Sequence, residues 1–191
     1  MLSKKIKEYF DRCVKSDYSG LSQNHPIILL NAIKNIIGDN REEHSKKLLD
    51  CMENKSKELP KRDGDQTILD DIAKEGIGLT VFVSDLEDAC QSGIPENIEK
   101  EAARLQWVSD NGLGGLETLI EVALQDFERL GKFSFHLFRS NIFNRDINKT
   151  WLYTRCLLKE ICKKPLPEPH ENIDVDCDLL IGNTKTQTLN F

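Results

Sequence analysis

The sequence predicts an all-α protein, a single-domain multi-helix bundle of about seven to nine helices followed by an extended, Pro-rich C-terminal tail. Apolar residues recur at helical spacing through most of the first 160 positions, which is the pattern of helices that bury one side against each other. Glycines and prolines interrupt the pattern at short intervals, where helices end and begin. With 191 residues, 39% hydrophobic and 30% charged, the chain is long enough for one domain with a substantial core.

Three helices are expected in the N-terminal third of the chain. The first covers residues 3–16 and ends at a Ser-Gly pair. The second covers residues 26–37, because proline suits a first helical turn and the following glycine suits a stop. It is apolar nearly all round, as a buried helix is. The third is expected to be capped by Asp39 or Asn40 and carries only a thin apolar stripe.

The middle of the chain predicts three more helices. A short one starts at Asp65 and closes at Gly76. A clearly amphipathic one covers residues 79–90, where the local run LTVFV would also suit a strand but the helical period continues too far for one. Pro95 begins the next helix, whose apolar stripe ends at Val108.

The last part of the helical region has the most regular pattern, over residues 116–130, which Gly131 is expected to stop. Residues 132–138 alternate in a way that fits a strand or a helix. We expect a helix, because an isolated strand would have no pairing partner. The final helix is expected over residues 147–162.

Two regions are therefore expected, a helical domain over residues 1–162 and an extended or disordered tail over residues 163–191. Three prolines within residues 165–169 are incompatible with a helix and favour extended geometry. The run Asp-x-Asp-x-Asp at residues 174–178 resembles the start of a calcium loop, but the glycine and glutamate that such a loop requires are missing. A solvated acidic tail is the preferred interpretation.

Charge and cysteine content argue for a cytoplasmic protein. The net charge of −6 opposes broad binding to nucleic acid or to an anionic membrane. The N-terminus lacks the apolar segment of a secretory signal, and no apolar run approaches the length that spans a bilayer. Six cysteines without a Cys-x-x-Cys pair indicate free thiols in a reducing compartment. We expect no cofactor and no metal site.

The most unusual segment covers residues 132–155, where six of the 13 aromatic residues are interleaved with five cations. Cationic side chains beside aromatic faces suit an anionic ligand or a protein partner. Two residues on a neighbouring predicted helix extend such a surface. The candidate binding residues are Arg104, Trp107, His136, Arg139, Arg145, Trp151 and Arg155.

The sequence therefore favours an interaction or regulatory protein that presents a basic, aromatic-rich surface to a protein partner or a small-molecule ligand. The alternative is a small-molecule enzyme or ligand-binding protein with a pocket between helices near residues 133–155. No histidine stands in a nucleophile motif, although catalytic partners can meet in space, so catalysis stays open. A third possibility is a homo-oligomer formed through an apolar helix face.

Overall fold

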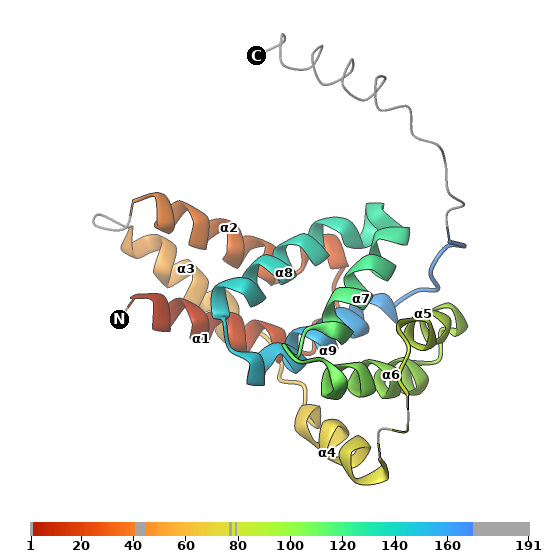
Figure 1. The fold of residues 1–191 in the computed structure, drawn as a ribbon. Coiled ribbons are helices and arrows are strands. Elements are labelled where there is room, and N and C mark those ends of the chain that lie inside the picture. Colours follow the sequence, from red (N-terminus) through yellow and green to blue (C-terminus); the bar gives the residue numbers. More distant parts are fainter. Residues whose placement is uncertain (1, 41–44, 77, 79, 170–191) are drawn as a thin grey trace, which may run out of the picture.

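The computed structural model describes residues 2–40, 45–76, 78 and 80–169, and these residues form nine α-helices (Figure 1). The helices are α1 (Leu2–Val14), α2 (Pro26–Asp39), α3 (Lys46–Lys57), α4 (Asp65–Glu75), α5 (Val83–Ser92), α6 (Pro95–Val108), α7 (Gly114–Ala123), α8 (Lys132–Asn144) and α9 (Thr150–Ile161). Within the described ranges, the β-type pairing consists of one antiparallel bridge between Ser16 and Lys61. The predicted all-α class is confirmed.

The helices surround one continuous hydrophobic core. Helices α1, α2 and α3 form one end of the molecule and α4, α5 and α6 the other, while α7, α8 and α9 connect the two ends (Figure 1). The fully buried side chains of Phe10, Leu119, Phe133 and Tyr153 come from four of these helices. The aromatic residues of the segment 132–155 thus contribute to the core as well as to the surface.

The amphipathic helix expected over residues 79–90 starts later than predicted. Helix α5 begins at Val83, and Phe82 is the extended residue before it, with 58% of its surface exposed. The Asp85 carboxylate accepts the N–H of Phe82 at 3.4 Å, so an acidic residue in the first turn determines where the helix begins. Apolar residues at helical spacing already occur before Val83, and for this reason the sequence pattern predicts the start of the helix too early. Leu79 lies outside the described residues.

The prediction of a single helix over residues 116–130 is wrong. Helix α7 ends at Ala123 and is followed by a 3₁₀ turn and by a π-helical turn over Phe127–Gly131. Asp126 leaves helical geometry, and its carboxylate accepts the N–H of Arg129 at 3.3 Å. The apolar Phe127 consequently points outward and is 70% exposed. Gly131 does not stop the chain but leads directly into α8, and the helix expected at residues 132–138 is confirmed.

Three glycines, Gly112, Gly114 and Gly115, lie just before and at the start of α7, and the last of them permits a close contact between helices. A Cβ on Gly115 would lie 2.7 Å from the carbonyl oxygen of the fully buried Ala102 in α6. The amides of Leu113 and Gly114 donate to the Ser109 hydroxyl at 3.2 and 3.1 Å, so both N–H groups have a partner within the chain. We expect Gly115→Ala to lower the free energy of unfolding by about 2 kcal/mol, because backbone must move to admit the methyl group.

Urea unfolding measures this effect, and Gly38→Ala provides a matched control. Gly38 lies inside α2, where an added methyl group would meet nothing within 4 Å, so alanine there is expected to be neutral or stabilising by about 0.5 kcal/mol. A Gly115→Ala protein as stable as the unmodified one would show that α6 and α7 do not depend on this approach.

Candidate functional site

The seven candidate binding residues do not form one surface. His136, Arg139 and Arg145 lie along α8 and at its C-terminus, beside α1 and α2. Arg104 and Trp107 lie on α6, near α4. Trp151 and Arg155 lie on α9, against the first residue of α4. The structure thus separates three groups, and the group on α8 borders an open hollow.

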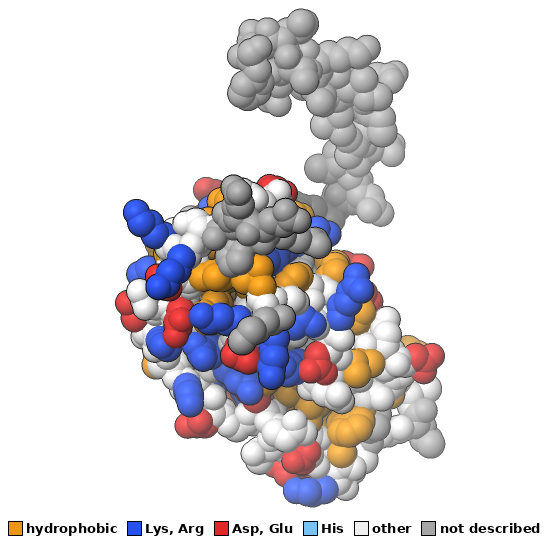
Figure 2. Space-filling view, turned by 90° about the vertical axis from the view of Figure 1, so that its left-hand side faces the viewer, with side chains coloured by type: hydrophobic (Ala, Val, Ile, Leu, Met, Phe, Trp, Pro, Cys, Tyr) orange, Lys and Arg blue, Asp and Glu red, His pale blue; other side chains and the backbone are white. Residues whose placement is uncertain are grey.

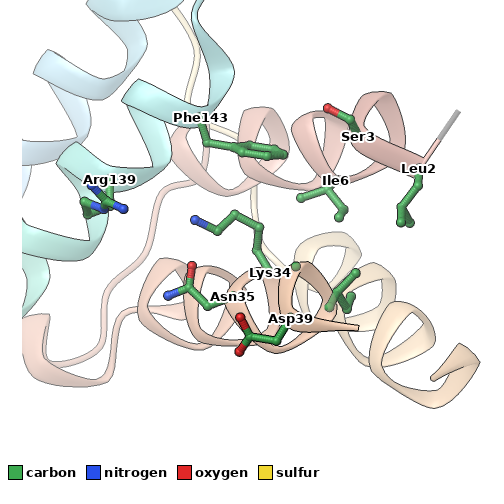
Figure 3. A pocket seen from close by; sticks show the side chains of 10 residues that line it. Leu2, Ser3, Ile6, Lys34, Asn35, Asp39, Arg139 and Phe143 are labelled. Carbon is green, nitrogen blue, oxygen red and sulfur yellow. The ribbon is translucent and has the colours of Figure 1, made fainter. Parts of the chain in front are cut away.

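That hollow is a groove between α1, α2 and α8, with a volume of about 720 Å³. Leu2 and Ile6 of α1 and Ile37 of α2 contribute apolar surface, and Phe143 of α8 covers one side. Lys34 extends from α2 beneath the Phe143 ring toward Arg139 (Figure 3). The groove therefore combines an apolar lining with cationic groups at one end.

Lys34 and Arg139 are close enough to affect each other. Burial, and secondly the positive charge of Arg139, lower the pKa of Lys34 from its usual value. The Lys34 ammonium lies 5.3 Å from the centroid of the Phe143 ring, a cation–π contact. In the described part of the chain, neither cation forms an ion pair with a carboxylate. Asp39 also lines this hollow but forms no ion pair with either of them. Two neighbouring positive charges that no carboxylate neutralises directly favour a bound anion.

A second hollow of about 440 Å³ continues the groove along α1 and the end of α8. Lys7 and Arg145 join Lys34 and Arg139 in lining it. The Lys7 ammonium donates to the carbonyl of Asn144 at 2.7 Å, and Arg145 takes a left-handed conformation (φ 50°) that ends α8. Lysine and arginine side chains accordingly gather on this face of the molecule (Figure 2). We call the two hollows together the basic groove.

His136 lies on α8 one turn before Arg139 and is half-buried. Its Nδ1 accepts a hydrogen bond from the side-chain amide of Asn31 at 2.9 Å. Burial, followed by the positive charges of Lys132 and Lys34, lowers the pKa of His136. At neutral pH the ring is therefore uncharged, and it joins α8 to α2 beside the cations of the basic groove.

The candidate residues on α6 and α9 hold helices together. The Trp151 ring N–H donates to the carbonyl of Asp65 at 2.7 Å, and Trp151 is 3% exposed. Arg155 donates to the Asp65 carboxylate at 2.8 Å and also to Glu99. The Trp107 ring N–H donates to a backbone carbonyl of α4 at 3.2 Å. These hydrogen bonds give each of the three side chains a structural role. The three side chains contact α4 and do not line the basic groove.

Arg104 is also engaged on the α4 side of the molecule. Its guanidinium donates to the Glu101 carboxylate at 2.7 Å and to the Thr80 carbonyl at 2.9 Å. The alternative interpretation expects a pocket near residues 133–155. Two polar aromatic side chains of this segment, His136 and Trp151, instead contact Asn31 and Asp65, which lie on different helices.

The structure does bring together a histidine and a cysteine that are 131 residues apart. His25 Nε2 lies 3.8 Å from the Cys156 sulfur. Nδ1 of the same ring accepts the N–H of Ile27 at 3.2 Å and caps α2, so the ring proton is on Nε2. Nε2 cannot then remove the thiol proton, and burial raises the pKa of Cys156 to about 12. This contact is a buried packing pair and lacks the base of a nucleophilic dyad.

Sequence reasoning missed Lys7 and Lys34. Lys34 carried a usable signal, since it is the only charged residue between Pro26 and Gly38, in an otherwise apolar helix. Lys7 carried none, because the first helix has several lysines. Cys156, Cys162, His170 and Cys177 are spaced too widely along the sequence for a compact zinc site, and the last two lie outside the described residues. Among the residues that the structure does describe, no group of three His, Cys, Asp or Glu is placed to hold a metal ion.

None of the helices in the described ranges is both long enough and apolar enough to cross a bilayer. Comparison of the chain with protein-family models, with curated proteins and with solved structures finds no match.

Proposed function

We propose that the protein is a binding protein whose basic groove accepts an acidic segment of a protein partner. The observation that carries the proposal is the pair Lys34 and Arg139, which are held close together without a carboxylate partner among the described residues. A carboxylate placed between them forms charge-assisted hydrogen bonds with both and relieves their mutual repulsion.

The shape and lining of the groove favour a peptide over a small anion. The two hollows adjoin, since Ser3, Lys34, Arg139 and Phe143 line both of them. Apolar side chains of α1 and α2 lie beside the cations, and a segment that carries both acidic and apolar side chains satisfies both kinds of surface. The cations provide specificity and rapid association, while apolar contacts stabilise the complex.

We further propose that the protein resides in the reducing cytoplasm. The five cysteines that the structure describes are free thiols, and burial raises the pKa of Cys90, Cys156 and Cys162 to about 12, 12 and 11. Protonated, buried thiols behave as small apolar side chains. Cysteines that remain free thiols are typical of a compartment in which thiols are kept reduced.

Reversal of the two cations tests the function. A fluorescein-labelled peptide of about ten residues that alternates aspartate and leucine is the probe, and fluorescence anisotropy measures its dissociation constant. We expect Lys34→Glu combined with Arg139→Glu to weaken binding by about tenfold or more, equivalent to roughly 1.4 kcal/mol. Binding by the unmodified protein is also expected to weaken as salt is raised.

The matched control carries the same change of charge elsewhere. Lys74 and Lys100 are exposed on α4 and α6, so Lys74→Glu with Lys100→Glu changes the net charge equally without altering the groove. If both double variants lose affinity to the same extent, attraction is a matter of net charge and the groove is not the site. If ATP binds and is lost with the groove variant while the peptide never binds, the small-molecule interpretation replaces this one.

A further inference from the structure

We propose that the occupant of the basic groove is the acidic segment of residues 171–181 from a second copy of this chain, an inference that rests on the proposed binding function. The groove and this segment have complementary charge. Among the described residues, the lining of the groove includes one carboxylate, Asp39, and four cations, namely Lys7, Lys34, Arg139 and Arg145, so its net charge is positive. Four carboxylates occur in the segment, namely Glu171, Asp174, Asp176 and Asp178.

The pattern of the segment matches the lining of the groove as well as its charge. Residues 173–179 read Ile-Asp-Val-Asp-Cys-Asp-Leu, so acidic and apolar residues alternate. Alternate side chains of an extended chain project to opposite sides, and such a segment offers aspartates on one side and apolar groups on the other. No lysine or arginine occurs from residue 165 to residue 184, so the segment brings no cation into the groove. The cations of the groove can bind the acidic side of such a segment, and Phe143 and Ile6 can contact its apolar side.

The point at which the described chain ends decides between the same copy and a second one. Leu166 lies in a hollow with Cys90, Ile98 and Ile161, at the end of the molecule formed by α5 and α6. The basic groove lies at the opposite end, where α1 and the C-terminus of α2 meet α8 (Figure 1). The described part of the chain therefore ends on the side of the body away from the basic groove.

The number of residues beyond Pro169 limits how far the aspartates extend from the body. Asp174 is five residues beyond Pro169, the last residue that the structure describes, and five residues span at most about 17 Å. A helical body of this size is about 40 Å across. Asp178, the most distant of the three aspartates, is nine residues beyond Pro169, and nine residues span at most about 32 Å, which is still less than the width of the body. The groove of a neighbouring copy, by contrast, is accessible to all three. Association in this manner is head-to-tail, because every copy carries both a groove and a segment, and it can close into a ring or continue as an open chain.

Charge-swapped full-length chains test the inference. The groove variant carries Lys34→Glu and Arg139→Glu, and the tail variant carries Asp174→Lys, Asp176→Lys and Asp178→Lys. Light scattering at low salt is expected to give the unmodified chain a mass that rises above 21.8 kDa with concentration. Each variant alone is expected to stay near that mass, because its groove no longer meets a tail of opposite charge. An equimolar mixture is expected to associate again, because the reversed groove of one variant meets the reversed tail of the other.

The outcomes separate this inference from the function on which it rests. An unmodified chain that stays monomeric at all concentrations, or whose association survives the tail variant, overturns the inference, while groove-dependent binding of the Asp-Leu peptide leaves the binding function intact. Failure of the peptide and of self-association together overturns both. Far-ultraviolet circular dichroism of each variant, compared with the Lys74→Glu and Lys100→Glu control, verifies that the helical fold is unchanged.

Discussion

Replacement of Asp65 by alanine is expected to lower the free energy of unfolding by about 3 to 5 kcal/mol, because it leaves two largely buried guanidinium groups without their shared anion. The Asp65 carboxylate accepts hydrogen bonds from Arg62 at 2.8 and 3.2 Å and from Arg155 at 2.8 Å. The side chains of all three residues are only 10 to 12% exposed. Among the described residues, one nitrogen of each guanidinium already has no hydrogen-bond partner, so neither arginine readily replaces the lost carboxylate.

The same residue joins three parts of the chain, which is why its loss is expected to affect the whole fold. Arg62 also donates to the Val14 carbonyl at the end of α1, at 3.0 Å. Arg155 belongs to α9 and also binds Glu99 of α6. Asp65 is the first residue of α4, and a negative charge there additionally favours the helix N-terminus.

Urea unfolding followed by circular dichroism measures the loss, and Asp71→Ala is the control on the same helix. Asp71 pairs with Lys74 at 3.0 Å on an open surface, so its replacement is expected to cost at most about 0.5 kcal/mol. Asp65→Asn keeps one acceptor and is expected to fall between the two. If Asp65→Ala and Asp71→Ala are equally mild, the network does not stabilise the fold as inferred.

The starts and ends of the helices show how far the sequence predicts this structure. Periodicity and proline placement predict the class and the starts of α2 and α6 correctly, because these depend on neighbouring residues. The break after α7 depends on a single capping carboxylate, Asp126, whose effect exceeds that of an uninterrupted apolar period. Propensity alone therefore overestimates the length of that helix.

The sequence predicts the candidate site only in part, for a reason of distance along the chain. A cation beside aromatic residues has the same local pattern whether it faces a ligand, as Arg139 does by our proposal, or Asp65, as Arg155 does. The two cases differ only through residues far away in sequence. Likewise, Lys34 becomes part of the groove because α2 packs against α8, more than 90 residues later. No pattern of neighbouring residues in the sequence specifies that α2 packs against α8.

Acid is expected to destabilise the fold through His25, which is 1% exposed. Burial, followed by the positive charges of Lys163 and Arg62, lowers its pKa from 6.5 to about 3. The unfolded chain therefore takes up a proton near pH 6.5, whereas the folded protein does so only near pH 3. The stability that depends on a neutral His25 is complete above pH 6.5 and is lost progressively as pH falls toward 3.

Between pH 7 and pH 5, this linkage amounts to about 2 kcal/mol of unfolding free energy. His25→Asn tests it, because asparagine retains an acceptor for the N–H of Ile27 at the start of α2 but does not titrate. The variant is expected to be less stable at pH 7, since it leaves a cavity beside Phe133, yet to lose about 2 kcal/mol less than the unmodified protein on acidification. His136 is present in both proteins, so its contribution cancels in the comparison. Parallel stability curves for the two proteins, from urea unfolding at pH 7, 6 and 5, would show that His25 is protonated equally easily in the folded and unfolded states, and that its burial against Cys156 is not maintained in solution.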